Sequence, residues 1–174
     1  MNKQNKQNKQ NKQTEKLLEG VKTQLTEQYQ LAFSDLLREN LESARPDWEW
    51  VKRLHAELRD RICNLTPNRL DIHADIHDKM DSEIFYSMIS NGAFDGTNLQ
   101  SLITFVFSRI RELEAPAKNV DTDAKLQEIL ELFQHANATI ATIVPAFIQA
   151  ANERLDDVYT DKEIFMAFLA KQKK

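Results

Sequence analysis

Two histidines spaced four residues apart are the residues in this chain whose types and spacing come closest to a chemical site. His73 and His77 lie in DIHADIHDKMD, residues 71–81, a stretch with four aspartates in a chain that has only four histidines. If the stretch is helical, residues four apart share a face, and Asp81 extends the row to i+8. Imidazole and carboxylate groups are common zinc ligands, so a metal site on His73, His77 and Asp81 is one interpretation.

The same stretch also fits the edge of an ordinary helix, and this is the interpretation we favour. In a helical zinc site of the HExxH type the residue after the first histidine is a catalytic glutamate, but here it is Ala74. A catalytic site needs a third ligand and an open position, and a structural site needs four ligands. No spacing points to the possible further ligands, which are Cys63, His55 and His135. We therefore predict no metal and no cofactor.

Other catalytic motifs are missing from the sequence. It contains neither a glycine-rich phosphate loop nor a GxSxG nucleophile elbow. Cys63 is the only cysteine, which excludes an intramolecular disulfide and a CxxC redox pair. It lies near an apolar stripe, where a buried structural thiol is more common than a nucleophile. We therefore predict no catalytic residue and a protein that is not an enzyme. Because a chain with a single cysteine fits a reducing compartment, we also expect an intracellular, cytoplasmic location.

The charge pattern argues against nucleic acid as a ligand. The net charge is −4, and the first 14 residues carry four lysines and no acid, so the rest of the chain has 19 basic and 27 acidic residues. Binding to a phosphate backbone needs a clustered positive surface. Membrane insertion is not expected either, because the longest strongly apolar run, LITFVF at 102–107, is too short to cross a bilayer.

The N-terminal segment repeats one tripeptide, NKQ, four times over residues 2–13. It has no apolar residue to bury and only like charges, so residues 1–14 are predicted to be a disordered tail. The repeat is either a neutral expansion or a weak electrostatic tether to an acidic surface. Residues 15–174 form the predicted domain.

From residue 15 onward, apolar residues recur with the period of a helix. The pattern predicts a first helix over 15–43 and a second from a cap at Asp47 to residue 65. A third helix is predicted over 69–81, and a further helical stretch stops at Asn91 and Gly92. The next helix is predicted over 98–113, after a capping box at Thr97. The helix over 98–113 should be the central one, because it is apolar on nearly every side. A run from about 121 should kink or split at Pro145, and a second capping box at Thr160 should open a short last helix. The predicted fold is all-α: one domain of about six to eight helices.

Four apolar residues are candidates for binding a partner. Trp48 and Trp50 are two apart, so they cannot both face one core, and an exposed tryptophan is a typical interface hot spot. Leu132 and Ile148 fall outside the main core stripe of their helix and could meet either a neighbouring helix or a partner.

Three long phrases resemble the T-complex protein 11 family of helical eukaryotic proteins. They are PDWEWVKRLHAELRDRICNLTPNRLDIHADIHDKMD at 46–81, NGAFDGTNLQSLITFVFSRIRELEAPAKN at 91–119 and LQEILELFQHANATIATIVPAFIQAANERL at 126–155. The chain keeps family-like turn residues at Gly92, Ala93, Asp95, Ala115 and Pro116. It departs at Glu114, where the family usually has cysteine, and at Lys118 and Asn119, where arginine and aspartate are frequent. These residues cap, turn or pack, so they argue for a shared fold and carry over no functional residue.

The resemblance implies a regulatory or scaffolding protein linked with cAMP-dependent kinase signalling and, in animals, with sperm function. It implies no enzymatic activity. We therefore expect a non-enzymatic module that binds other proteins, with self-association as one option. One alternative is a structural component of a larger assembly, including a virion or other particle, in which the tail orders on packing. The other is a small metal-dependent enzyme on His73, His77 and Asp81.

Overall fold

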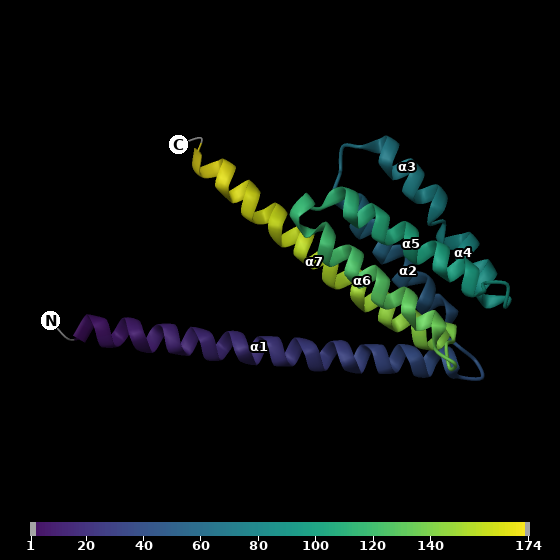
Figure 1. Cartoon of the computed structure of the whole chain (residues 1–174), viewed down its shortest axis with the longest axis horizontal. Coiled ribbons are helices and arrows are strands. Elements are labelled where there is room, and N and C mark those ends of the chain that lie inside the picture. The colour runs from purple at the N-terminus through teal and green to yellow at the C-terminus, as the bar shows by residue number, and fades with distance from the viewer. Residues whose placement is uncertain (1–2, 173–174) are drawn as a thin grey trace. The chain divides into compact units, whose positions relative to one another are not determined.

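The protein is described by a computed structural model that covers residues 3–172, with side chains from residue 8 onward. Within those residues there are seven α-helices and two short 3-10 turns but no strand, which confirms the all-α prediction (Figure 1). The elements are α1 (Lys3–Glu42), α2 (Trp48–Asn64), α3 (Leu70–Lys79), α4 (Ser82–Ser90), α5 (Gly96–Leu113), η1 (Pro116–Lys118), α6 (Asn119–Glu131), η2 (Leu132–Gln134) and α7 (Ile140–Gln172).

The chain divides into two compact units, residues 1–36 and residues 37–174. The first unit is helical from Lys3, which differs from the predicted disorder of residues 1–14; residues 1 and 2 lie outside the described part. Lysine and glutamine are good helix formers, and the first glycine is Gly20, so local propensity permits the helix to start early. Most of the large apolar side chains described for this unit, including Leu18, Val21 and Leu25, are exposed, and Phe33 is half-buried.

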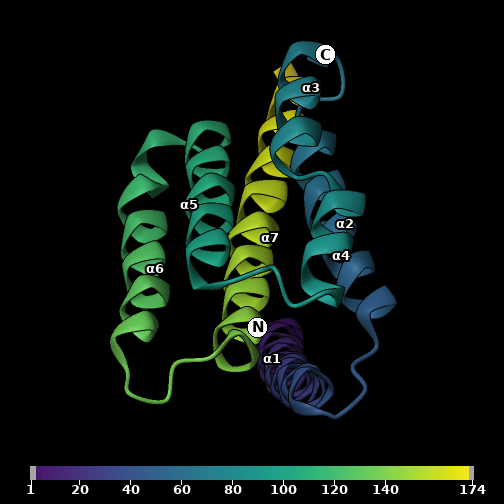
Figure 2. The ribbon, with the colours of Figure 1, turned by 90° about the vertical axis from the view of Figure 1, so that its right-hand side faces the viewer.

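The second unit is a bundle organised around the first half of α7. This half of α7 packs against α2, α5 and α6, while α3 and α4 pack against α2. Figure 2 shows α5, α6 and α7 side by side, with α2 and α4 on the other side of α7. The prediction that the helix at 98–113 is central was wrong, because the polar side of α5, with Thr97, Gln100 and Thr104, remains exposed to solvent.

A capping box starts α5 two residues earlier than the sequence predicts. The Asp95 carboxylate accepts a hydrogen bond from the backbone N–H of Asn98 (2.9 Å), and the Asn98 side chain accepts one from the Asp95 N–H (3.0 Å). Thr97 and Gln100 also fit the box pattern, but Thr97 lies inside the helix. By contrast, the predicted cap at Asp47 is confirmed, because its carboxylate accepts from the Trp50 N–H.

Replacing Asp95 with alanine should therefore lower the free energy of unfolding by about 1 kcal/mol, the usual effect of losing an N-cap side chain. Thr97→Ala should change it by less than about 0.5 kcal/mol, because Thr97 is exposed and caps nothing. Urea denaturation of the two variants measures both values. A larger loss for Thr97→Ala than for Asp95→Ala would place the cap where the sequence pattern puts it.

The break between α6 and α7 lies at residues 132–139, not at Pro145 as predicted. Thr139 and Thr142 exchange hydrogen bonds, each side-chain oxygen accepting from the other residue's N–H (3.2 and 3.0 Å), and this sets the start of α7. Pro145 therefore removes only one backbone hydrogen bond, close to the start of α7. The predicted cap at Thr160 is also wrong, since α7 runs unbroken to Gln172.

A buried charged cluster joins the end of α5 to α6 and α7. Arg154 Nη2 donates to Glu114 Oε2 (2.9 Å), and the two side chains are 8% and 1% exposed. The Thr122 hydroxyl donates to the same carboxylate oxygen and accepts from Arg154 Nε (2.7 and 2.9 Å). Glu114, one of the departures from the family pattern, is thus fully paired inside the bundle.

Candidate functional site

The structure does not bring the three predicted metal-ligand candidates together. The imidazole Nε2 of His73 lies 2.8 Å from the Cys63 carbonyl and 2.7 Å from the Thr66 carbonyl. Both partners are acceptors, so Nε2 carries the hydrogen and donates it to the Cys63 carbonyl at the end of α2 and to the Thr66 carbonyl in the turn that follows. This nitrogen is therefore occupied in tying α3 to the end of α2.

His77 and Asp81 lie apart from that arrangement. His77 is exposed on α3. Because α3 ends at Lys79, Asp81 does not continue its face; instead it caps α4 and accepts from the N–H groups of Glu83 and Ile84 (both 2.9 Å). In the described residues no group of three or more His, Cys, Asp or Glu side chains is placed to hold a metal ion. The predicted shared face therefore fails because a new helix begins at Asp81.

The other residues named from the sequence are either half-buried or buried in the bundle. Trp48 and Trp50 are both half-buried in the first turn of α2, and Leu132 is half-buried in η2. Ile148 is buried, at 6% exposure, so it serves the core and not a partner surface. Cys63 is buried as well, and burial raises the pKa of its thiol, with the charge of Asp60 acting in the same direction.

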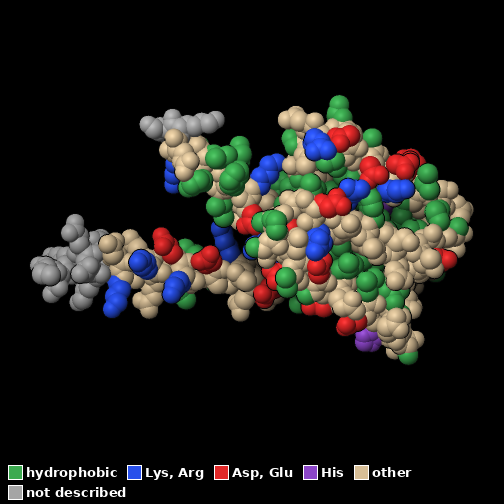
Figure 3. Space-filling view, turned by 45° about the horizontal axis from the view of Figure 1, so that its top comes forward, with side chains coloured by type: hydrophobic (Ala, Val, Ile, Leu, Met, Phe, Trp, Pro, Cys, Tyr) green, Lys and Arg blue, Asp and Glu red, His purple; other side chains and the backbone are tan. Residues whose placement is uncertain are grey.

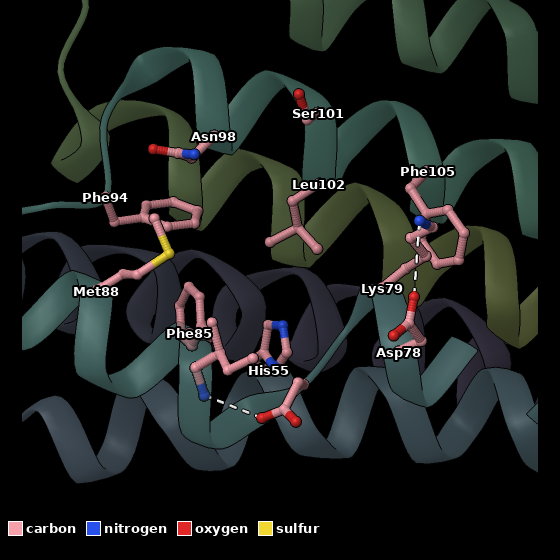
Figure 4. Close-up of a pocket in the computed structure, with 12 residues that line it drawn as sticks. His55, Asp78, Lys79, Phe85, Met88, Phe94, Asn98, Ser101, Leu102 and Phe105 are labelled. Carbon is pink, nitrogen blue, oxygen red and sulfur yellow. Dashed lines mark hydrogen bonds and ion pairs between the residues drawn. The ribbon is translucent and has the colours of Figure 1, made fainter. Parts of the chain in front are cut away.

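One cavity of about 250 Å³ opens between α3, α4 and α5, and we call it the aromatic cavity (Figure 4). His55 and Phe85 face Leu102 and Phe105 across it, and Phe94 lies beside Met88 at one end. The rings of His55 and Phe85 stack at 4.3 Å, and Phe94 meets Phe85 edge to face at 5.1 Å. The lining is therefore largely apolar.

Charged groups stand at the edge of the aromatic cavity. Asp78 and Lys79 form an ion pair (3.7 Å) beside Phe105 in Figure 4. Asp81 also lines the cavity, close enough for its charge to act on His55. The backbone N–H of Ile84 lowers the pKa of Asp81, together with that of Glu83 and the charge of Arg59, so its carboxylate is ionised at neutral pH. With two acids and one lysine, the edge is net negative.

His55 is held neutral within the wall of this cavity. Its Nδ1 lies 2.9 Å from Ser82 Oγ, which also accepts a hydrogen bond from Arg59. Burial, aided by the positive charge of Arg59, lowers the pKa of His55 to about 4 in spite of the opposing charge of Asp81. A neutral imidazole stacked on a phenyl ring contributes apolar surface, which fits a binding cavity better than an acid–base site.

The lowered pKa of His55 should make the folded state weaker in acid. The unfolded chain binds more protons than the folded chain between the ordinary value of 6.5 and about 4, so the contribution of His55 is complete above this window and is lost as the pH falls through it. The stability advantage of the wild type over His55→Gln should shrink by on the order of 3 kcal/mol between neutral pH and pH 4. Urea titrations at several pH values measure this difference; a constant difference would contradict the assignment.

The end of α7, which the sequence predicts to be a short separate helix, carries a run of exposed apolar side chains. Ile164, Phe165 and Phe168 are 64%, 59% and 55% exposed, and Met166 and Leu169 are exposed as well. Figure 3 shows green side chains gathered on this segment. The signal was present in IFMAFLA, residues 164–170, which is apolar on every side of the helix.

Residues 5–156 match the family model described as T-complex protein 11. The chain belongs to the T-complex protein 11 family. The resemblance stated from the phrases at 46–81, 91–119 and 126–155 is thereby confirmed. A search of curated proteins and a search of solved structures each gave no significant match.

In this T-complex protein 11 chain the family match covers most of α1, all of α2 to α6 and the packed half of α7. The exposed apolar run at 164–169 lies beyond the matched residues. No described helix is both long enough and apolar enough to span a bilayer. The end of α7 is therefore a feature that family membership does not explain.

Proposed function

We propose that this T-complex protein 11 chain is a non-enzymatic interaction module that binds protein through the exposed end of α7. The observation that carries the proposal is the run of five large apolar side chains at 164–169, all exposed on a helix whose first half is anchored in the bundle. An apolar patch of this kind on a folded protein is typical of an interaction site. The packed half of α7 would hold the exposed half in a fixed direction.

The family supports the same reading, since T-complex protein 11 proteins are not known as an enzyme family. More specifically, we propose a regulatory scaffold inside the cell that is linked to kinase signalling. The aromatic cavity suits it too, because about 250 Å³ is below the roughly 300–1,000 Å³ of most small-molecule sites. A space of that size suits side chains of a protein partner.

Affinity retention with matched variants tests the proposed function. Immobilised full-length protein is exposed to lysate of the source cells, and the retained proteins are identified by mass spectrometry. Proteins that bind at α7 should be retained by the wild type and lost with Phe165→Asp/Phe168→Asp. Ala170→Asp adds a charge on the opposite side of the same end of α7 and should retain them. Equal retention by all three proteins would contradict the proposal.

A further inference from the structure

Two features of the second unit lack a counterpart within it: the apolar end of α7 and the aromatic cavity. Resting on the proposed function, we propose that the partner is a second copy of this chain, whose α7 end inserts into the aromatic cavity of the first. One copy would thus supply a protruding helix and the next copy a recess. The proposal accounts for both features with a single contact.

The protruding part has the form of a knob. Successive helical residues turn by about 100°, so Ile164, Phe165, Phe168 and Leu169 fall on one side of α7, and Ala170 falls on the other. Those four side chains are exposed, and we call them the knob. Lys171 follows Phe168 by three residues and therefore lies one turn farther along beside it.

The aromatic cavity matches the knob in chemistry and in size. Its facing walls carry Phe85, Phe94 and Phe105, and aromatic rings pair well in edge-to-face or offset geometry with a further phenyl ring. Its volume of about 250 Å³ admits side chains but not a whole helix. Phe165 or Phe168 would therefore enter, while the helix itself stays at the mouth.

Charge complementarity favours the second copy over an unrelated apolar segment. The mouth of the cavity is net negative through Asp78 and Asp81, with Lys79 as the one lysine among its lining residues. The outer end of the knob brings the positive charge of Lys171 next to Phe168, whereas Asp161 lies at the inner end, where it lines a separate recess with Leu65 and Thr66. Opposite charges around an apolar contact fix its orientation and raise the association rate.

The contact is heterologous, because knob and cavity are different surfaces of one chain. Such contacts join copies head to tail and lead to rings or open chains of subunits. A knob of four side chains buries less than a standard interface, so the association should be weak and visible only in the micromolar range or above.

Mixing two complementary variants of the full-length chain tests this arrangement. Phe165→Asp/Phe168→Asp removes the knob, and Ser101→Trp fills the cavity from the exposed side of α5. Each variant alone should self-associate about tenfold or more weakly than the wild type, as expected for a lost hot spot. An equimolar mixture should associate again but stop at a dimer, because only one intact knob and one intact cavity remain per pair. Sedimentation velocity over a concentration series measures these masses.

Matched controls separate the contact from damage to the fold. Ala170→Asp and Thr104→Trp carry the same new side chains outside the knob and the cavity, and both should associate like the wild type. Circular dichroism of each variant checks that the helices are retained. Self-association of Ser101→Trp at wild-type strength would overturn the proposal, because it would exclude the cavity.

The proposed self-association would also be overturned if the wild-type protein stayed monomeric at the highest concentration of the sedimentation series. If the retention experiment still showed α7-dependent partners, the proposed function would stand and only the identity of the partner would fail. If retention did not depend on α7 either, both proposals would fall.

Discussion

Replacing Arg154 with methionine is expected to lower the free energy of unfolding by about 3 to 5 kcal/mol. The substitution keeps much of the side-chain length but leaves the Glu114 carboxylate, which is 1% exposed, without its cation. Thr122 would still donate to that carboxylate, but a hydroxyl cannot neutralise a buried charge. Chemical denaturation of the full chain measures the loss, which is a large fraction of the stability of a typical domain.

Two further variants isolate the cause. Arg111→Met removes a surface ion pair with Asp123 and should change the free energy of unfolding by no more than about 1 kcal/mol. Arg154→Met combined with Glu114→Leu removes both buried charges and should recover most of the loss. A double variant as unstable as Arg154→Met alone would show that packing of the arginine, and not its charge, is what the bundle needs.

Phe147→Ala should cost about 3 to 5 kcal/mol as well, here through a cavity in the apolar core. Phe147 is 2% exposed on the packed half of α7, and its ring lies 6.4 Å from that of Phe107 on α5. Truncation would remove this contact between the two helices inside the buried core. Thermal or urea denaturation measures the effect.

The same substitution on the exposed half of α7 is the matched control. Phe165→Ala should change the stability of the monomer by less than about 0.5 kcal/mol, because that ring is 59% exposed. The pair of variants tests the division of α7 into a packed half and an exposed half. A comparable loss from Phe165→Ala in dilute protein would mean that the end of α7 is packed in the monomer.

Local signals in the sequence predicted local structure well. The cap at Asp47 and the apolar periodicity of α2 depend on residues within one or two turns of each other, and both predictions hold. The capping box of α5 was misplaced by two residues because Thr97 with Gln100 and Asp95 with Asn98 satisfy similar patterns. A sequence pattern alone does not decide between such neighbours.

Predictions that depended on where a helix stops were less successful. Asp81 was read as a member of the helix at 69–81, but it caps the next helix, and this one change separates it from His73 and His77. Thr160 resembles a cap, yet α7 continues through it with no break. In both places the packing of the helices in the bundle decides where a helix ends, and the local sequence pattern carries no information about that packing.

The candidate site was beyond sequence reasoning for a different reason. The aromatic cavity takes residues from α2, α3, α4 and α5, and the buried pair of Glu114 and Arg154 spans 40 positions, so only the assembled bundle brings these groups together. The knob at the end of α7 was readable in IFMAFLA, but whether that run is packed or exposed depends on what the bundle leaves uncovered.

Position-resolved photo-crosslinking tests most directly the central claim that the end of α7 binds protein. A photoreactive amino acid is placed at Phe168 in one full-length protein and at Thr104, on the exposed polar side of α5, in another. The account predicts discrete adducts from position 168, with peptides of the aromatic cavity among the products, and none of these from position 104. No adduct at 168, or the same adducts from both positions, would contradict it.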